Sequence, residues 1–132
     1  LVNLLFIQLS RQLQSSMHMQ SVNAEFYPIF QNARMEILSN ISEDWSSEKM
    51  AALTNLSVSH FYKYYTLFFG RSPKKELLEA RISHAKYLLS INHLSVNQTA
   101  ALCGFQNLSH FSRYFKQLVG VRPRKYRQLS TE

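Results

Sequence analysis

The sequence predicts an all-helical fold in which two copies of a unit, each a helix, a tight turn and a second helix, are joined by a long central helix. Three observations predict it. Part of the 132-residue chain repeats itself, apolar residues recur at helical spacing, and serine, glycine and proline stand where helices begin and end. The two units are expected over about residues 26–72 and 94–129, and the central helix over about residues 73–92.

The internal repeat is visible when the chain is compared with itself at two offsets. At an offset of 50 positions, residues 59–61 (Ser-His-Phe) fall on the identical residues 109–111. At an offset of 49 positions, residues 51–53 (Ala-Ala-Leu) fall on the identical residues 100–102. The change of offset indicates one extra residue in the second copy, in the connection between its two helices.

The chain is expected to open with a short amphipathic helix and a linker. Leucines recur at spacings of three and four between positions 1 and 13, whereas residues 14–23 are polar and lack an apolar stripe. The first helix is interpreted either as a core-facing helix of a preceding domain or as a dimerising helix. A further helix is predicted to begin near Pro28, because proline is favoured at the first helical position, and to run to Ile41.

The first unit begins at Ser46, a predicted N-cap for a helix with Met50, Ala51 and Leu53. Ser57 or Ser59 is expected to start the second helix, which is rich in aromatic residues and ends at Gly70. Pro73 then opens the central helix. Its predicted apolar stripe consists of Leu77, Leu78, Ile82, Ala85, Leu88 and Leu89.

The second unit begins with a predicted capping box formed by Ser95 and Gln98. Gly104 is expected to form its turn, so a bulky residue there should unfold this unit alone. A last short helix is predicted from Pro123 to about residue 129. The residues expected to be buried in this unit are Ala100, Ala101, Leu102, Phe111, Phe115 and Leu118.

Basic charge is concentrated on the repeated part of the chain. Residues 45–132 contain thirteen Lys and Arg against four Asp and Glu, whereas residues 1–44 contain two against four. Such a distribution indicates a polyanionic partner, either nucleic acid or an anionic membrane surface. The single cysteine excludes an internal disulfide and favours a reducing, intracellular setting, and no apolar run reaches transmembrane length.

Each unit meets the requirements of a homeodomain-like helix-turn-helix, whose second helix lies in the DNA major groove. Small residues are expected where the two helices cross, at positions 51–52 and 100–101. The second helices, about residues 57–69 and 107–119, bury one face and expose the other. Outward side chains that can read base edges are Ser59, Tyr62, Lys63 and Thr66 in the first and Asn107, Ser109, Ser112, Arg113 and Lys116 in the second.

Basic residues that follow these helices are predicted to contact DNA phosphates, together with the serines that begin the first helix of each unit. Such contacts fix the register of a protein on the duplex without reading its sequence. The predicted phosphate set is Ser46, Arg71, Lys74, Lys75, Ser95, Lys116, Arg122, Arg124, Lys125 and Arg127.

Other functions fit the sequence less well than DNA binding. An enzyme is not expected, because the sequence lacks a glycine-rich phosphate loop, an HExxH motif and paired carboxylates on one helical face. No metal or cofactor is expected, since His60 and His110 have no further ligands beside them.

Cys103 is interpreted as a core residue. Arg81 is interpreted as structural, paired with Glu36 or Glu79, with phosphate contact as the alternative. The alternative function is a basic helical module that binds an acidic partner or an anionic membrane surface.

Residues from about 26 to 129 resemble the DNA-binding domain of the AraC/XylS family of bacterial transcription regulators. The match is strongest at residues 100–105, 109–116 and 120–127, and it is looser in the first unit, where Asn55 stands in place of the usual glycine. The resemblance implies that the two recognition helices enter consecutive major grooves on one face of the DNA. It also implies base contacts from Ser59, Tyr62 and Lys63 and from Leu108, Ser109, Ser112 and Arg113.

The resemblance further implies a bacterial, cytoplasmic, nucleoid-associated protein whose partners are double-stranded DNA and RNA polymerase. A small-molecule or peptide effector is expected to act only through a separate N-terminal sensor domain, of which residues 1–24 would be a remnant. Residues 25–132 would then be the DNA-binding domain. A homodimer formed through residues 1–13 or through the sensor domain is a further expectation, and a membrane partner is not expected.

Overall fold

The computed structural model describes residues 23–91 and 93–130, and these residues form helices and turns without a strand. The all-helical prediction is therefore confirmed for this part of the chain. The expected helix at residues 1–13 lies outside the described residues. The described helices are residues 23–39, α2 (Ser47–Ala52), α3 (Val58–Phe69), α4 (Pro73–Ile91), α5 (Val96–Leu102), α6 (Leu108–Val119) and α7 (Pro123–Ser130).

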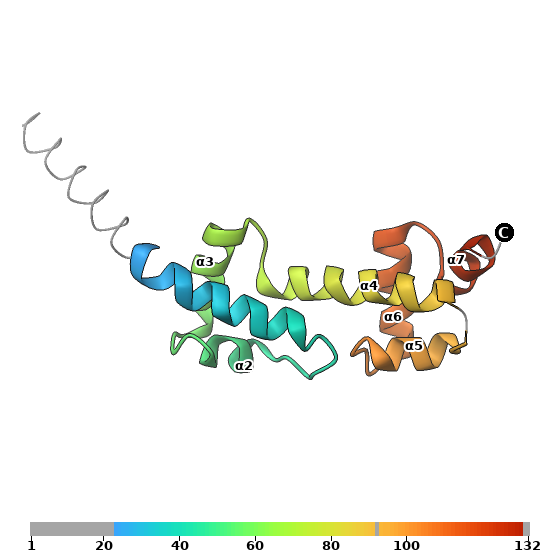
Figure 1. The fold of residues 1–132 in the computed structure, drawn as a ribbon, viewed down its shortest axis with the longest axis horizontal. Coiled ribbons are helices and arrows are strands. Elements are labelled where there is room, and N and C mark those ends of the chain that lie inside the picture. The colour runs from blue at the N-terminus through green and yellow to red at the C-terminus, as the bar shows by residue number, and fades with distance from the viewer. Residues whose placement is uncertain (1–22, 92, 131–132) are drawn as a thin grey trace, which may run out of the picture.

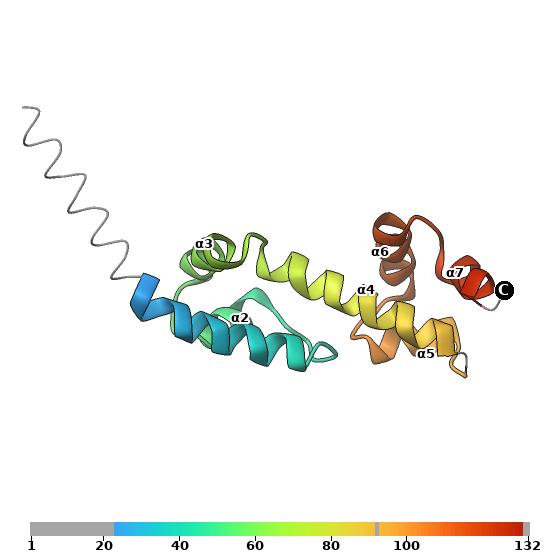
Figure 2. The ribbon, with the colours of Figure 1, turned by 45° about the horizontal axis from the view of Figure 1, so that its top comes forward.

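The helices form two subdomains at the two ends of α4 (Figure 1). The first subdomain contains helix 23–39 with α2 and α3, and the second contains α5, α6 and α7. In Figure 1, α2 and α5 both lie along the lower edge of the molecule, while α3 and α6 both rise toward its upper edge. Figure 2 also places α3 and α6 near opposite ends of α4. The repeat in the sequence is thus a repeat of architecture, with the two units arranged along one helix.

The predicted starts and ends of the helices agree with the structure at most positions. Ser46, Ser57 and Ser95 are N-caps whose hydroxyls accept from backbone amides three residues later, and Ser95 and Gln98 form the predicted capping box. Gly70 and Gly120 end α3 and α6 in the left-handed conformation, with φ of 77° and 98°. Local capping chemistry therefore sets the boundaries of the repeated unit.

The helix predicted to start at Pro28 is already formed at residue 23. Proline lacks the amide hydrogen for one helical hydrogen bond, so tertiary contacts must stabilise the segment that precedes it. Aromatic residues supply these contacts. The rings of Phe26 and Tyr27 lie edge-on to Tyr64 and Phe68 of α3, with centroids 5.2 and 5.3 Å apart.

The first core lies between helix 23–39, α2, α3 and the start of α4. The rings of Phe30 and Phe61 stack with centroids 5.6 Å apart, and the indole of Trp45 donates to the carbonyl of Asn40 at 2.8 Å. The buried residues of this core are Phe30, Ile37, Trp45, Met50, Ala51, Phe61, Tyr65 and Leu77.

The second core lies between α4, α5 and α6, with Tyr126 of α7 at its edge. Its buried residues are Ile82, Ala85, Leu89, Ala100, Cys103, Phe111 and Phe115. Cys103 is fully buried, as expected of a core residue, and burial raises the pKa of its thiol to about 11. Because α4 contributes to both cores, the two subdomains share one structural element.

Four residues predicted to be buried are exposed, namely Ala52, Ala101, Leu102 and Leu118. For the first three the reason is geometric, because α2 and α5 have only six and seven residues and each turns a single narrow stripe toward its core. Met50 and Ala51 form that stripe in α2, and Thr99 and Ala100 form it in α5. The small residues at the helix crossings are thus Ala51 and Ala100, one in each unit. Leu118 lies in the last turn of α6, whose buried residues are Phe111 and Phe115.

The turns of the two units adopt the same left-handed backbone with different residues. Asn55 has a φ of 59° at the position equivalent to Gly104, whose φ is 92°. Asparagine tolerates this conformation better than most residues, so the first turn forms without a glycine. At Gly104 a Cβ atom would lie 2.7 Å from the carbonyl oxygen of Ile41. The expectation that a bulky residue at Gly104 affects only the second unit is therefore wrong, because this position touches the first subdomain.

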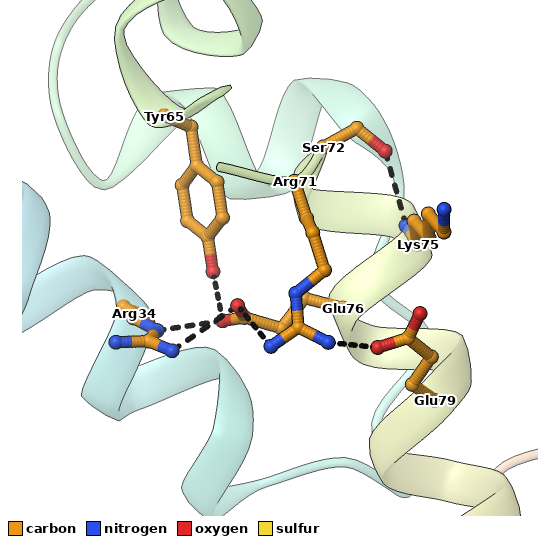
Figure 3. A network of polar contacts seen from close by, with 7 residues as sticks. All are labelled: Arg34, Tyr65, Arg71, Ser72, Lys75, Glu76 and Glu79. Atoms are coloured by element: carbon orange, nitrogen blue, oxygen red, sulfur yellow. Dashed lines mark hydrogen bonds and ion pairs between the residues drawn. The ribbon is translucent and has the colours of Figure 1, made fainter. Parts of the chain in front are cut away.

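A network of polar side chains joins three elements of the first subdomain around Glu76 (Figure 3). The carboxylate of Glu76 accepts two bonds from Arg34, at 2.6 and 3.1 Å, and one from the Tyr65 hydroxyl at 2.8 Å. Arg71 lies 3.4 Å from Glu76 and also pairs with Glu79. Burial alone would raise the pKa of Glu76, but the bonds from Arg34 and Tyr65 and the charges of Arg34 and Arg71 together lower it. The network ties helix 23–39 to α3 and α4.

The two left-handed turns are expected to respond differently to alanine. Asn55→Ala should destabilise the chain by about 1 kcal/mol, because alanine pays the cost of a positive φ. Gly104→Ala should destabilise the chain by about 3 kcal/mol or more, because the added methyl group clashes with the carbonyl of Ile41 in addition to the strain of a positive φ. Chemical denaturation measures both. Asn55→Gly is the matched control and should stay within about 1 kcal/mol of the native chain. Equal losses for the two alanine variants would show that Gly104 is not constrained by contact with the first subdomain.

The Glu76 network should make stability depend on acid pH. A carboxyl whose pKa is lower in the folded than in the unfolded chain stabilises the fold above its unfolded pKa, about 4.3, and this contribution disappears as pH falls through the folded value. Glu76→Gln should therefore lower the free energy of unfolding by about 2 kcal/mol at neutral pH. The stability of this variant should also fall less than that of the native chain as the pH is lowered. Denaturation curves at stepped pH test this. Glu79→Gln, which removes the more exposed partner of Arg71, should cost less than about 1 kcal/mol.

Candidate nucleic-acid interface

The outward face of α6 carries half of the predicted base-reading residues. Ser109, Arg113 and Lys116 are exposed, Leu108 is 43% exposed, and Ser112 is half-buried. Together with Gln117 and Arg122 they line an open hollow of about 820 Å³. Gln117 was missed in the sequence analysis, although it lies one helical turn after Arg113 and so belongs to the same face. This face combines hydrogen-bonding side chains with one apolar contact.

A second hollow of about 500 Å³ borders the first and extends it toward α5 and α7. Both hollows are lined by Leu108, Ser112 and Arg122, so they form one continuous surface. The residues that the second hollow adds are Ser95, Val96, Asn97, Pro123, Arg124 and Arg127. The start of α5, the face of α6 and the start of α7 therefore lie together, which brings the predicted phosphate contacts Ser95, Arg122 and Arg124 to one surface.

The outward face of α3 is less basic than that of α6. Ser59, Lys63 and Thr66 are exposed as predicted. Tyr62 is half-buried, and its hydroxyl lies 2.9 Å from that of Ser47 on α2. Helical spacing alone puts Tyr62 on the outward face and does not reveal this contact. The structure ties its polar end to the neighbouring helix.

Asn107 also has a local function that the base-reading prediction did not foresee. It is the N-cap of α6, and its side-chain oxygen accepts from the backbone amide of His110 at 3.1 Å. This bond satisfies an amide that the helix itself leaves unpaired. The side chain is therefore held at the start of the recognition helix rather than free to extend.

Six basic residues of the predicted phosphate set are exposed and form no ion pair with another described residue. Each can offer its full charge to a polyanion, because no carboxylate in the described part of the chain competes for it. These residues are Lys74, Lys75, Lys116, Arg122, Arg124 and Lys125.

Two further arginines of that set are engaged inside the protein. Arg71 pairs with Glu76 and Glu79. Arg127 donates to the carbonyl of Leu89 at 3.4 Å and to that of Leu94, so it holds the end of α4 and the connection that follows. Both guanidinium groups therefore have partners within the protein, while Arg71 stays 43% exposed and Arg127 also lines the second hollow.

The two predicted serine contacts belong to helix N-termini. The hydroxyl oxygens of Ser46 and Ser95 each accept a backbone amide at 3.0 Å, from Lys49 and Gln98. A hydroxyl that accepts can still donate its own hydrogen, so the capping bond leaves one hydrogen for a phosphate oxygen.

The remaining candidates do not form a second kind of site. Among residues 23–91 and 93–130, no group of three His, Cys, Asp or Glu side chains is placed to hold a metal ion. The side chain of His60 lies 3.0 Å from the hydroxyl of Ser57, which caps the same helix. None of the described helices is both long enough and apolar enough to cross a membrane.

Known proteins resemble the chain in both sequence and structure. The MmsAB operon regulatory protein of Pseudomonas aeruginosa is 36% identical over 81 residues, which are 61% of this chain and 26% of that protein. The DNA-binding domain of AdpA, solved in complex with a target DNA, superposes with a TM-score of 0.73 at 25% identity, covering 76% of this chain and 90% of that one. A transcriptional regulator with an AraC-type DNA-binding domain from Chromobacterium violaceum superposes with a TM-score of 0.69 at 27% identity. The match covers 83% of this chain and 98% of that one.

The family assignment follows from these likenesses and from the extent of one match. The chain spans about a quarter to a third of the length of the curated relatives it matches. A family model described as a helix-turn-helix domain matches residues 50–129, which is more than half of the chain and runs from within α2 to α7. The chain therefore belongs to the AraC/XylS family of helix-turn-helix transcription regulators.

Proposed function

We propose that this chain is the DNA-binding part of a transcription regulator and that it binds one face of a DNA duplex, with α3 and α6 in consecutive major grooves. The observation that carries the proposal is the exposed face of α6. Ser109, Arg113 and Lys116 surround an open hollow there, and an equivalent helix stands at the other end of α4. The similar DNA-binding domain of AdpA was solved in complex with a target DNA, which supports binding of DNA by this fold.

Base reading is proposed to come mainly from α6. Arg113 is exposed and has the fork of donors that matches the acceptors of guanine, while Ser109 and Ser112 can pair with several bases. Leu108 offers an apolar contact to a thymine methyl group. On α3, Ser59 and Lys63 offer the corresponding donors.

The duplex backbone is proposed to be held by the six exposed basic residues, four of which belong to the second subdomain. Lys116, Arg122, Arg124 and Lys125 lie on or after α6, whereas Lys74 and Lys75 begin α4. Neutralising phosphates releases condensed counterions, so binding should weaken steeply with salt. The second subdomain is therefore proposed to supply the larger share of the affinity.

A monomer is proposed to be enough for binding to an asymmetric site. In many helix-turn-helix proteins a dimer places two recognition helices about 34 Å apart, one turn of DNA. Here the two recognition helices belong to one chain and are joined by α4. The duplication inside the chain replaces the two-fold symmetry of a dimer.

The wider setting of the function is also a proposal. We infer action in the bacterial cytoplasm at the nucleoid, contact with RNA polymerase, and control by an effector through a separate sensor domain that could also dimerise. We infer that the chain acts by binding rather than by catalysis. The alternative of an acidic protein or membrane partner is not favoured, because Lys116, Arg122 and Arg124 line the hollows at the outward face of α6 beside serines that can hydrogen-bond to bases.

Selection of bound sequences from a random duplex pool tests the proposal. We expect an enriched asymmetric site made of two short blocks about one helical turn apart, and footprinting should show protection on one face of the duplex. Binding should occur at one protein per site. Enrichment of no sequence, or tighter binding to anionic vesicles than to the best duplex, would contradict the proposal.

Two single substitutions should separate base reading from backbone contact. Arg113→Ala is expected to weaken binding to the selected site by about 1–3 kcal/mol and to relax preference at one position. Lys125→Ala should weaken binding to the selected duplex and to random duplexes alike. It should also reduce the slope of log binding constant against log salt concentration by about 1. Titrations on both duplexes at several salt concentrations measure the two effects. If Arg113→Ala weakened both duplexes equally, Arg113 would be a phosphate contact instead.

A further inference from the structure

The two subdomains meet directly beside α4, at a place that the DNA-binding surface does not include. The turn of the second subdomain lies against the connection between helix 23–39 and α2. A Cβ atom on Gly104 would lie 2.7 Å from the carbonyl oxygen of Ile41 and 3.0 Å from the Cα of Ser42. Glycine is thus required here both by its positive φ and by the closeness of another backbone.

Arg81 of α4 occupies the centre of this contact. Its Nε donates to the carbonyl of Ile41 and its Nη2 to the carbonyl of Glu43, each at 2.7 Å. Its guanidinium carbon lies 5.9 Å from the ring centroid of Phe105, which packs on the second core. The proposed partners Glu36 and Glu79 are not the ones it binds. One side chain therefore touches the loop of the first subdomain and the turn of the second.

The contact is partly buried, which strengthens its polar bonds. Burial lowers the pKa of Arg81, with the charge of Asp44 opposing this change. Bonds from an ionised donor to backbone carbonyls are among the stronger hydrogen bonds in proteins. A cleft of about 430 Å³ opens beside the contact, lined from the first subdomain by Asp44 and Trp45 and from the second by Phe105 and His110. Arg81 and Gly104 also line this cleft, so the contact borders open space on that side.

We propose that the contact of Arg81 and Gly104 with residues 41–43 sets the relative position of α3 and α6, and thereby the spacing of DNA half-sites that the chain accepts. Arg81 is a positioning residue: it touches no DNA in this scheme and acts through the orientation of the two recognition helices. The inference rests on the proposed function, because spacing matters only if both helices bind one duplex. Adding one base pair between half-sites turns the second by roughly 34° and moves it by about 3.4 Å, so a rigid pair of helices discriminates between spacings.

The first test needs no DNA. Spin labels on Leu67→Cys and Leu118→Cys, both exposed and at the ends of α3 and α6, report the distance between the recognition helices, while the native Cys103 is fully buried and protected from labelling. We expect a narrow distance distribution in the parent chain and one broadened by about twofold or more in Arg81→Ala. Arg81→Lys should also broaden it, because a single ammonium group cannot reproduce the two-pronged contact.

The second test uses the selected duplex with its spacer lengthened or shortened by one base pair. The parent chain should lose affinity by about tenfold or more, and Arg81→Ala should lose about threefold or less. Affinity for a duplex with one half-site should be the same in both. Lys86→Ala, which removes an exposed charge of α4 away from the contact, should behave as the parent does. Circular dichroism and thermal melting confirm that each variant is folded; if Arg81→Ala is not, Arg81→Lys takes its place in both tests.

The outcomes distinguish the inference from the proposed function. A parent chain that selects no duplex site overturns the proposed function. A parent chain that binds its site, with Arg81 variants that keep both the narrow distance distribution and the parent's spacing preference, overturns this inference alone. Broadened distances together with a flattened spacing preference support it.

Discussion

The burial of α4 in two cores is the constraint on which the rest of the structure depends. Its first turns place Leu77 among the aromatic residues of the first core, and later turns place Ile82, Ala85 and Leu89 in the second. Each residue of an α-helix is rotated about the helix axis by a fixed angle from the one before it. The positions of these side chains along α4 therefore determine the side of the helix on which each subdomain packs. The apolar residues of α4 thus anchor both subdomains to the same helix, and the contact of Arg81 at its middle is proposed to fix their relative position.

Positive charge serves two purposes in this small chain. Arg34, Arg71, Arg81 and Arg127 bind carboxylates or backbone carbonyls and connect elements to one another. The planar guanidinium suits this purpose, because several of its donors can be satisfied at once by fixed acceptors. The lysines at α4 and α7 remain exposed and available to a polyanion. The type of basic residue alone does not decide its role: Arg113, Arg122 and Arg124 are also exposed.

Much of the fold could be predicted from the sequence because its boundaries are set locally. Serine caps, glycine ends and the capping box at Ser95 depend on neighbours within a few residues, and these predictions are confirmed. What was missed depends on distant parts of the chain. The helix around Pro28 is stabilised by rings on α3, Tyr62 is held by Ser47, and Arg127 reaches the end of α4. Ala52 and Leu118 fit an apolar pattern but face outward, since periodicity does not show how wide a stripe of the helix its neighbours cover.

For the candidate site, helical spacing predicts the outward face of α6, but the prediction omitted Gln117 on that same face.

The buried thiol of Cys103 gives this molecule an intrinsic reporter of its own motions. It is the chain's single cysteine, it belongs to the second core, and its raised pKa keeps it protonated and unreactive while that core is closed. Alkylation of the thiol therefore requires an opening of the second subdomain. Its rate under native conditions reports how often that subdomain opens, and openings confined to the first subdomain do not contribute. The chain thus carries a natural reporter of local opening in its second subdomain.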